Sequence, residues 1–559
     1  MKSRKQFGCK FMMTFSNLQE FLQKVINNLK DFCSDKKRAN CLYLRYFLYL
    51  YTRNWYIMAK KDNTTSIGFE DAIWRAADKL RGNLNASEYE GVVLGLIFLK
   101  YISDKFEAKF QELLKDEYAD VEDKDEYEAD GVFFVPQDAR WSVISLAAHT
   151  PEIGKVIDDA LEAIERENPK LKGVLPGNYA RPELDKRRLG DVVDLFTNIH
   201  MLASGDEKDL LGRVYEYCLQ KFASMEGKNA GEFYTPSCIV RTIVEILQPY
   251  QGRVYDPCCG SGGMFVQSAK FIENHQKDIQ NISVYGQEAN PSTWKMAHMN
   301  VAIRGLEANL GQSYADTFFN DQHPTLKADF IMANPPFNLS DWGADKLEKD
   351  PRWKYGLPPA SNANFAWMQH MIYHLSPVGR IGLVLANGAL SSQSGGEGQI
   401  RQKIVEADLV EGIVALPSQL FYSTQIPVSL WFLSRHKQQP GKVLFVDARN
   451  MGTMVDRAHR ELMQEDITKI ADTFEANRKG TLEDEAGYCA VKTLQDIQAQ
   501  DFILTPGRYV GIAEQEDDGE PFAEKMQRLT SELSGLFQES HRLEEEIRKQ
   551  LGSIGFELQ

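Results

Sequence analysis

Residues 256–265 read Asp256-Pro257-Cys258-Cys259-Gly260-Ser261-Gly262-Gly263-Met264-Phe265 and lie between a strand-like run and a segment with helical spacing. Glycines at such a turn let the backbone bend sharply and let a ligand approach without obstruction by a Cβ atom. The preceding Asp-Pro and the lack of a GKS or GKT ending argue against a phosphate-binding P-loop. The stretch therefore predicts a strand–turn–helix unit of an α/β fold, whose turn is either a ligand site or a plain structural turn.

Similar strand-like runs recur through the middle of the chain and alternate with helical stretches. They are found at 253–255, 282–286, 328–333, 380–385, 410–416 and 429–433. Strands that alternate with helices indicate a parallel sheet covered on both faces. Ligands of such sheets bind at the carboxyl ends of the strands, where the glycine-rich turn is also expected to lie.

An acidic residue follows the second of these runs, in Val284-Tyr285-Gly286-Gln287-Glu288. A carboxylate at the end of this strand can accept both hydrogen bonds from a ribose diol. A glutamate at the protein surface is the alternative interpretation of Glu288. Together with the glycine-rich turn, this acid predicts a cofactor that contains adenosine.

The run 329–333 leads directly into Asn334-Pro335-Pro336-Phe337. Two prolines remove two backbone donors and fix φ, so this corner is rigid. The side-chain oxygen of Asn334 and the carbonyl of Pro335 can each accept one N–H from a planar amino group. The alternative interpretation is a proline-rich turn after a strand.

Two such acceptors suit the methylation of an exocyclic amine on a base. The lone pair of this amine is delocalised into the ring, and preorganised acceptors stabilise the positive charge that develops on the nitrogen in the transition state. Phe337 offers a stacking face for a base swung out of the duplex. Because no covalent enzyme intermediate is required, no cysteine nucleophile is expected.

The first 57 residues differ from the rest in charge, with 11 Lys and Arg against 3 Asp and Glu, whereas the whole chain has 64 against 79. We favour an upstream extension that precedes a natural start at Met58, and a basic tail that contacts nucleic acid is the alternative. The apolar run 41–58 contains two arginines and is too short and too charged to span a bilayer. No membrane association is therefore expected.

Helical periodicity dominates both ends of the remaining chain. The run Val92–Leu99 is apolar on every side, as is typical of a helix buried in a bundle. Beyond Gly519, apolar residues follow a three–four alternation at Met526, Leu529, Leu533, Leu536, Leu543 and Ile547. About three heptads predict a short coiled-coil-like helix that packs on its own domain or on a partner subunit.

The amino-acid composition indicates which class of protein to expect. The chain is 43% hydrophobic and 26% charged, which is typical of a soluble, folded protein, and we expect it in the cytoplasm. Its eight cysteines fall in no CxxC or CxxH pattern, so neither a zinc site nor a disulfide framework is expected.

These segments resemble the motifs of amino-methyltransferases, and the wider pattern resembles the methylation (M) subunit of type I restriction–modification systems. The resemblance extends over roughly 66–508, and further stretches that support it are 231–237, 361–367, 416–422 and 426–431. It implies an α/β fold with a helical N-terminal domain, a Rossmann-like class I methyltransferase domain and a C-terminal helix. It also implies methyl transfer from S-adenosylmethionine to N6 of adenine in DNA.

The resemblance assigns cofactor-binding roles to individual residues. Residues that it places against the methionine part of the cofactor are Glu232, Phe233, Tyr234, Thr235, Pro236 and Ser237. Those that line the pocket are Asp256, Gly260, Ser261, Gly262 and Gly263. Glu288 is placed at the ribose and Asp316 near the adenine, although the usual Gly-Asp pair is Ala315-Asp316 here. No metal ligand is implied.

The resemblance further implies several partners. They are a specificity subunit that reads the DNA site, a second copy of the M subunit and double-stranded DNA, with a restriction subunit as an optional addition. A net charge of −15 agrees in part, because DNA binders usually carry a basic field and an acidic chain can borrow affinity from a partner. The predicted segments are a basic extension at 1–57, a helical domain at 58–205, a methyltransferase domain at 206–515 and a C-terminal helix at 516–559 that contacts the partner.

Two other functions remain open. Enzymes that methylate guanine N2 in RNA or a protein glutamine amide share the Asn-Pro-Pro-aromatic corner, but the helical domain and the segments after the corner favour DNA. A cofactor-binding scaffold without catalysis is the second, and the intact Asn334 and Phe337 argue against it.

Overall fold

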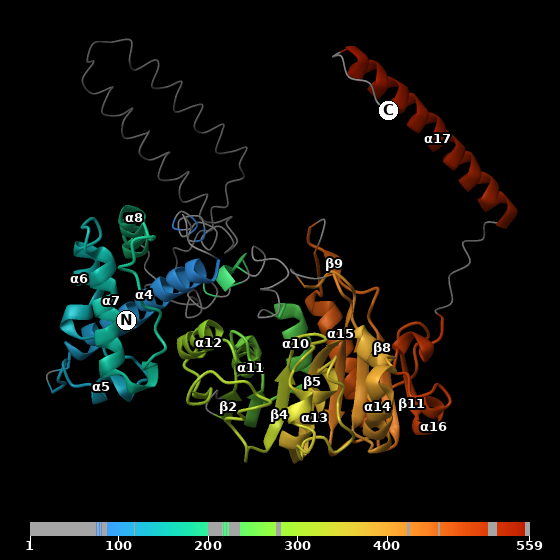
Figure 1. Cartoon of the computed structure of the whole chain (residues 1–559), viewed down its shortest axis with the longest axis horizontal. Helices are drawn as coiled ribbons and strands as arrows, with labels where there is room; N and C mark the ends of the chain where they lie inside the picture. Colours follow the sequence, from blue (N-terminus) through green and yellow to red (C-terminus); the bar gives the residue numbers. More distant parts are fainter. Residues whose placement is uncertain are drawn as a thin grey trace, which may run out of the picture. The chain divides into compact units, whose positions relative to one another are not determined.

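The computed structural model describes residues 86–116, 118–198, 235–275, 281–421, 425–456, 459–512 and 522–553, with isolated positions between 74 and 222. The chain forms two compact units, Met1–Lys79 and Leu80–Gln559. The first unit lies almost wholly outside the described residues, and so does the predicted extension at 1–57. Figure 1 gives the elements of the second unit.

Helices make up the amino-terminal part of the second unit. They are α4 (Ala86–Leu113), α5 (Asp125–Glu128), α6 (Trp141–Leu146), α7 (Ile153–Glu167) and α8 (Lys186–Thr197). The predicted run Val92–Leu99 lies in α4 and is buried throughout. A Cβ atom on Gly95 would lie 2.3 Å from the ring of Pro176, so the helix needs glycine here to let the chain approach. The helical N-terminal region is thus confirmed.

A sheet of nine strands forms the centre of the rest. The strands are β1 (Gly252–Asp256), β2 (Ile282–Gly286), β3 (Ala308–Asn309), β4 (Ala328–Ala333), β5 (Leu375–Ala386), β6 (Val410–Ala415), β7 (Val428–Ser434), β8 (Lys442–Asp447) and β11 (Cys489–Thr493). Their order is β11-β8-β6-β7-β5-β4-β1-β2-β3. All six predicted runs are strands, whereas β3, β8 and β11 were not predicted. A separate ribbon pairs β9 (Thr453–Met454) with β10 (Arg460–Glu461).

The prediction of an all-parallel sheet is wrong in part. Strands β3, β2, β1, β4 and β5 are parallel, as are β6 and β8. Strand β7 instead runs antiparallel to both β5 and β6. The described residues of the connection 416–427 contain no helix that would carry the chain back across the sheet, so β7 returns antiparallel to β6. Strand β11 forms an antiparallel edge beside β8, a common addition to α/β sheets.

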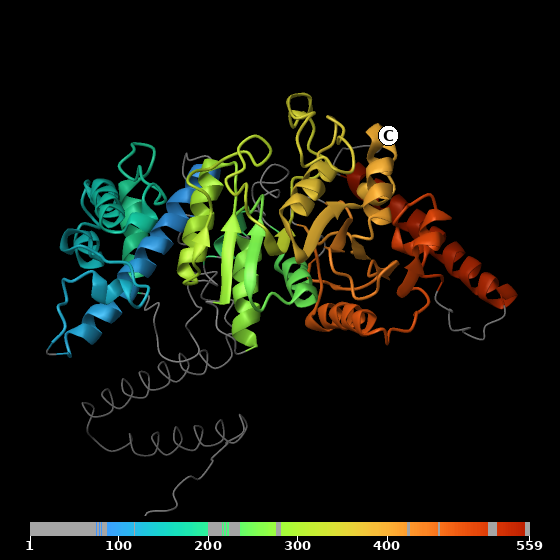
Figure 2. The same cartoon turned by 90° about the horizontal axis from the view of Figure 1, so that it is seen from below.

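Helices cover both faces of the sheet (Figure 2). They are α10 (Ser237–Leu247), α11 (Gly263–Asn274), α12 (Pro291–Ile303), α13 (Asn364–His374), α14 (Glu397–Glu406), α15 (Gln464–Lys479) and α16 (Leu494–Gln498). Side chains of a strand alternate between faces, and β5 shows which helices lie where. A Cβ atom on Gly382 would lie 2.5 Å from Ile243 of α10, whereas Ile381 and Leu383 belong to the core formed with α13 and α14.

The predicted C-terminal helix is confirmed as α17 (Phe522–Ser553). Its apolar stripe is exposed, with exposed fractions between 43% at Leu529 and 67% at Leu536. Among the described helices, none has the length and apolar character that crossing a bilayer requires.

Candidate active site

Three predicted motifs start at the carboxyl ends of neighbouring parallel strands. In the parallel register of β1 and β4, Tyr255 lies beside Ile331, and in that of β1 and β2, Asp256 lies beside Gly286. The segments that follow β1, β2 and β4 therefore leave the sheet side by side. This edge brings together the glycine-rich turn, Glu288 and the Asn-Pro-Pro-Phe corner, as predicted for ligand sites of such sheets.

The glycine-rich turn leads from β1 into α11. Gly260 has φ 53° and Gly262 has φ 81°, both in the left-handed region that favours glycine. A Cβ atom on Gly263 would meet nothing within 4 Å, so open space borders the start of α11. Ser261 is buried, and its carbonyl accepts a hydrogen bond from Asn300 Nδ2 at 2.7 Å. The hydrogen bond from Asn300 thus holds the turn in place, while the space beside Gly263 remains open.

Glu288 ties this turn to the end of β2. Its carboxylate accepts hydrogen bonds from the backbone N–H of Gly260 at 3.0 Å and of Asn290 at 2.8 Å. Burial raises the pKa of Glu288, although these backbone hydrogen bonds oppose the shift. Burial also raises the pKa of Asp256 to about 7, against hydrogen bonds from Cys258 and with help from the charge of Glu288. The carboxyl groups of Asp256 and Glu288, which follow β1 and β2, are therefore close enough to influence each other's ionisation.

Asp316 lies in the turn between β3 and β4. This turn is joined to the same edge, because Ala315 N–H donates to the carbonyl of Glu288 at 2.9 Å. The Asp316 side chain is exposed, and its Oδ1 accepts from the backbone N–H groups of Phe318 at 2.8 Å and Phe319 at 3.2 Å. Glu288 and Asp316, which resemblance places at the ribose and the adenine, are thus connected in the structure.

Asn334 begins the corner after β4. Its Nδ2 donates to Thr235 Oγ1 at 3.0 Å, a contact between residues 99 positions apart. Its Oδ1 is buried and has no hydrogen-bond partner within the part of the chain that the structure describes. Buried polar atoms are nearly always paired, so this unpaired acceptor beside the other predicted motifs makes Asn334 a candidate for ligand binding.

Phe337 and the loop after it are also held in place. The Phe337 ring meets Phe421 edge to face, with ring centroids 5.7 Å apart. Asn338 has φ 54°, and its Oδ1 accepts hydrogen bonds from Asn364 Nδ2 at 2.9 Å and Asn362 Nδ2 at 3.2 Å. The stretch 361–367, singled out in the sequence, therefore supports the corner through its asparagines.

Two family models match the chain. The one described as N-6 DNA Methylase matches residues 206–518, and the one described as HsdM N-terminal domain matches residues 69–196. The type I restriction enzyme HindI methylase subunit of Haemophilus influenzae is 52% identical over 446 residues, which cover 76% of this chain and 100% of that protein. The chain belongs to the methylase subunits of type I restriction enzymes.

Other members of this methylase family are also similar. The type I restriction enzyme MjaIX methylase subunit of Methanocaldococcus jannaschii is 39% identical over 516 residues, which cover 87% of this chain and 92% of that protein. A solved type I restriction-modification system methyltransferase subunit from Streptococcus thermophilus has a TM-score of 0.68 and 24% identity, and it covers 80% of this chain and 100% of that one. The solved structure has the same fold, and the family is that of the N6-adenine DNA methyltransferases.

Part of the predicted cofactor set of this methylase subunit lies outside the described residues. Glu232, Phe233 and Tyr234 fall there, so their roles stay predictions. Of the following three residues, Thr235 binds Asn334, and Pro236 precedes α10, which begins at Ser237. The structure thus brings Thr235 to the Asn-Pro-Pro-Phe corner, a contact that the sequence did not indicate.

Sequence reasoning missed several polar residues of this methylase subunit. Buried Gln287 donates to the carbonyls of Ala315 and Asn320 at 3.1 and 2.8 Å, and so fixes the turn that carries Asp316. Its place beside Glu288 at a strand end was a signal that could have found it. Asn300 gave no such signal, because it lies within α12.

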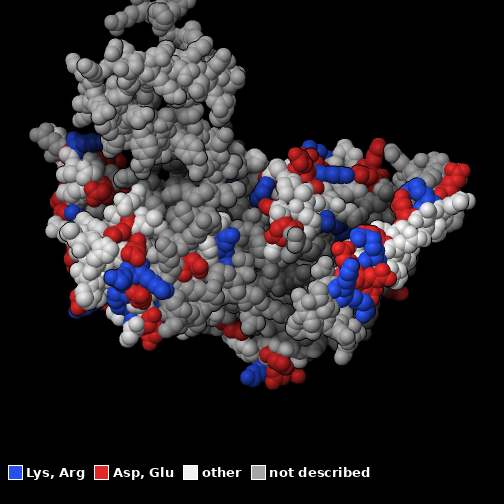
Figure 3. All heavy atoms as spheres, turned by 90° about the horizontal axis from the view of Figure 1, so that it is seen from above, with Lys and Arg blue, Asp and Glu red and all other residues white. Residues whose placement is uncertain are grey.

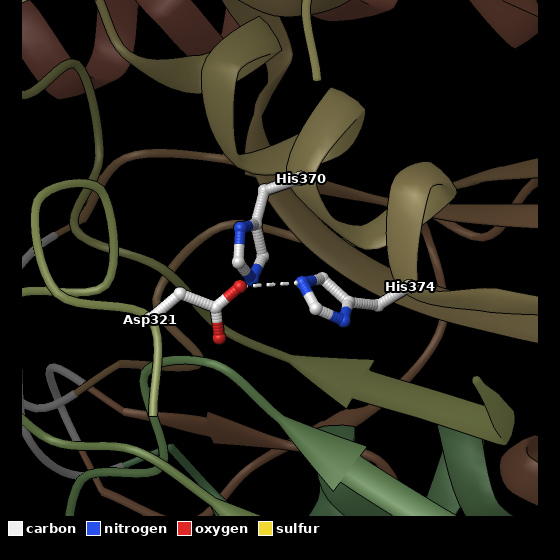
Figure 4. Close-up of side chains that lie close together, drawn as sticks. All are labelled: Asp321, His370 and His374. Atoms are coloured by element: carbon white, nitrogen blue, oxygen red, sulfur yellow. Dashed lines mark hydrogen bonds and ion pairs between the residues drawn. The ribbon is translucent and has the colours of Figure 1, made fainter. Parts of the chain in front are cut away.

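A cluster of Asp321, His370 and His374 was also missed. Their nearest ligand-type atoms all lie within 4.8 Å of one another, and this is the only such group found among the described residues. In Figure 4 the two imidazoles come from α13 and face the carboxylate of Asp321. The i, i+4 spacing of the histidines places them on one side of a helix and could have predicted the pair.

Proposed function

We propose that this chain transfers a methyl group from S-adenosylmethionine to N6 of an adenine in duplex DNA, and that Asn334 and Pro335 receive the amine. The observation that carries the assignment is the amide of Asn334. Its nitrogen is occupied by Thr235, and its oxygen is buried with no partner among the described residues. The amide is thereby oriented as an acceptor, which is what an incoming N–H group requires.

The corner favours the reaction through its acceptors. Asn334 Oδ1 and the Pro335 carbonyl each accept one N–H, which draws electron density onto the nitrogen and stabilises its developing positive charge. Pro335 and Pro336 keep these acceptors fixed, because proline locks φ and has no N–H that could compete for them. Phe337 offers a ring face to the flipped base while its edge contact with Phe421 holds the ring.

The strand-end turns fit an adenosine cofactor. Open space borders Gly263 where a side chain would otherwise begin. The Glu288 carboxylate accepts the backbone N–H groups of Gly260 and Asn290, and since a carboxylate has about four acceptor sites, it can also accept from a ribose hydroxyl. Asp316 is exposed and is available to an adenine amine. The bound cofactor supplies a methyl group on a positively charged sulfur.

Partners are part of the proposal. We infer that a separate specificity subunit selects the DNA site, that a second copy of this subunit completes the methyltransferase, and that a restriction subunit is an optional addition. The acidic balance of the chain supports this division of labour, because phosphate contacts need basic surface. On the described part of the face in Figure 3, acidic and basic side chains are intermixed rather than gathered into a basic field.

The enzymatic assignment is tested by mapping the methylated atom. Purified chain is incubated with its specificity subunit, duplex DNA and cofactor carrying a labelled methyl group, and the modified nucleoside is identified by mass spectrometry. N6-methyladenine is expected. Label found instead on another atom of the DNA, or in a glutamine of the incubated subunits, would refute the assignment to DNA adenine.

Helix α17 is the proposed contact to the specificity subunit. Its leucines are exposed although leucine side chains favour burial by about 1.5–3 kcal/mol each. The triple variant Leu529→Gln, Leu533→Gln and Leu536→Gln keeps helix-forming residues but removes the apolar stripe. It should reduce co-purification of the specificity subunit at least tenfold.

The matched control for α17 changes its polar residues instead. The variant Glu532→Gln, Glu539→Gln and Glu546→Gln alters exposed carboxylates of the same helix and should co-purify normally. Equal recovery of the specificity subunit with the leucine variant would remove α17 from the interface.

A further inference from the structure

Arg352 is a buried arginine outside every motif found in the sequence. Its side chain is paired with Asp350, with Nε 2.8 Å from one carboxylate oxygen and Nη2 2.7 Å from the other. Nη1 also donates to the carbonyl of Thr317 at 3.1 Å, and Nη2 donates to that of Phe318 at 2.5 Å. One guanidinium therefore joins its own loop to the turn that carries Asp316.

Asp316 holds the same two peptide groups from their other side. The peptide that contributes the Thr317 carbonyl to Arg352 gives its N–H, that of Phe318, to Asp316 Oδ1. The next peptide does the same with the Phe318 carbonyl and the Phe319 N–H. Two consecutive peptide groups thus lie between the guanidinium and the carboxylate, and hydrogen bonds in such chains strengthen one another.

The third contact of Arg352 fixes the hydrogen positions of His370. Nη1 lies 3.1 Å from His370 Nδ1, and because a guanidinium only donates, this nitrogen must accept. The ring hydrogen is then on Nε2, which faces the hydroxyl of Tyr255 at 3.0 Å. Burial, followed by the charges of His374 and Arg352, lowers the pKa of His370 well below its usual value, which agrees with a neutral ring.

His374 has the opposite pattern. Its Nδ1 faces the carbonyl of Leu326 at 3.1 Å, and its Nε2 faces Asp321 Oδ2 at 2.9 Å. Both neighbours are acceptors, the backbone carbonyl on one side and the carboxylate on the other. Burial opposes ionisation of Asp321, but the hydrogen bond and charge of His374 outweigh it and lower the pKa of Asp321 to about 2.

The position of the ring hydrogen of His370 argues against a metal ion among Asp321, His370 and His374, although the spacing of these residues would allow one. A metal ligand needs a lone pair on the nitrogen that faces the ion, and Nε2 of His370 carries a hydrogen because Arg352 occupies Nδ1. The group contains two acid–base pairs, Arg352 with Asp350 and His374 with Asp321. Figure 4 shows the second of these pairs beside His370.

We propose that Arg352 is a positioning residue for the cofactor, which it orients by fixing the Asp316 carboxylate through the two shared peptide groups. The inference rests on the proposed function, which places Asp316 at the adenine of the cofactor. Asp350 and His370 hold the guanidinium in the required plane. Loss of Arg352 should therefore weaken cofactor binding more than it slows methyl transfer.

A double-mutant cycle tests this inference, because residues that act as one unit are not additive. Binding of S-adenosylhomocysteine is measured by calorimetry for wild type, Arg352→Met, Asp316→Ala and the double variant. Each single change should weaken binding about tenfold, and the double variant should bind no more than about twofold more weakly than the single variants. At saturating cofactor, kcat of Arg352→Met should stay within about threefold of wild type while KM for the cofactor rises.

The matched control is Arg253→Met. Arg253 forms a similar pair with Asp329 at 3.1 Å, but at the amino end of β1, away from the proposed cofactor edge. Its cofactor binding should equal that of wild type. Should Arg352→Met fail to fold, Arg352→Lys keeps the charge but not the fork that spans two carbonyls, and it should show the same pattern.

Several outcomes would overturn the inference, and they are separable from failure of the proposed function. Additive losses in the cycle, or unchanged binding in Arg352→Met, would exclude a role through Asp316. Stoichiometric zinc or manganese in the purified protein would replace the hydrogen-bonded cluster by a metal site. A wild-type chain that binds no S-adenosylhomocysteine would instead refute the proposed function itself.

Discussion

The turn after β4 and the turn after β3 lie at the same edge of the sheet, yet they satisfy their polar groups in opposite ways. In the first, Asn334 is held by one hydrogen bond to Thr235, and its oxygen has no partner among the described residues. In the second, Asp316, Arg352 and the peptide groups between them are all hydrogen-bonded. Under the proposed function, the first turn carries the unpaired acceptor for the substrate amine, and the second carries a hydrogen-bonded group that binds the cofactor.

The free acceptor is costly to the protein before substrate binds. Leaving a buried polar atom unpaired costs about 1–3 kcal/mol, and an incoming amine removes this penalty as it forms the bond. The turn that carries Asp316 has no such unpaired group, since its hydrogen bonds are already made. We therefore expect substitutions at Asn334 to change the rate of methyl transfer, and substitutions at Asp316 or Arg352 to change the affinity for the cofactor.

Removal of the free acceptor should have the largest effect. Asn334→Ala should lower kcat on the order of 10³-fold, as loss of one preorganised transition-state contact does elsewhere, while cofactor binding survives. Methyl incorporation under single-turnover conditions is the measurement. Asn362→Ala, which removes a hydrogen bond to Asn338 in the neighbouring loop, should stay within about threefold. Near-normal turnover by Asn334→Ala would end the distinction between the two turns.

The environment of Asp256 can be tested without substrate, through the pH dependence of the folding stability. Its pKa is raised to about 7 in the fold, mainly by burial, from about 3.9 in the unfolded chain. Its protonated form is thus favoured by folding, so this stabilising contribution is complete below pH 4 and is lost as the pH rises to 7. At 1.36 kcal/mol per pH unit the loss amounts to about 4 kcal/mol at most.

Asp256→Asn should abolish this part of the pH dependence. The cofactor-free variant should gain thermal stability relative to wild type at pH 8 and show little gain at pH 4, as measured by the midpoint of thermal unfolding. The exposed Asp345→Asn variant should follow wild type at both values. A gain by Asp256→Asn that is equal at both values would show that burial of its charge is not the cause.

A smaller effect is expected from the anchor of the catalytic amide. Thr235→Val removes the hydroxyl that accepts from Asn334 Nδ2, so the amide can rotate, and kcat should fall about tenfold, the equivalent of one hydrogen bond of 1–1.5 kcal/mol. Thr235→Ser keeps the hydroxyl and should retain wild-type turnover. If both variants lose cofactor affinity and keep kcat, Thr235 acts on the cofactor alone, as the family resemblance suggested.

Motifs that form within a few residues could be predicted from the sequence. The strand before Asn334 and the turn at Gly260–Gly263 depend on local spacing, on proline and on glycine, and the structure has them where predicted. The reversal of β7 could not be predicted in the same way, because its direction depends on which strands it pairs with. The strand β11 has a short, mixed sequence that gave little signal, whereas β8 was missed although 443–446 is an apolar run between Gly441 and Asp447.

The amino-acid sequence by itself determined the α/β class, the rigid Asn-Pro-Pro-Phe corner and the family, because these depend on residue types at short, fixed spacings. Only the tertiary structure decided which polar groups are paired and which stay free. Asn334 meets Thr235 across 99 positions, and Arg352 meets Thr317 across 35. Hydrogen bonds need atoms within about 3 Å, and only the packing of α10 and α13 against the sheet brings such distant residues that close.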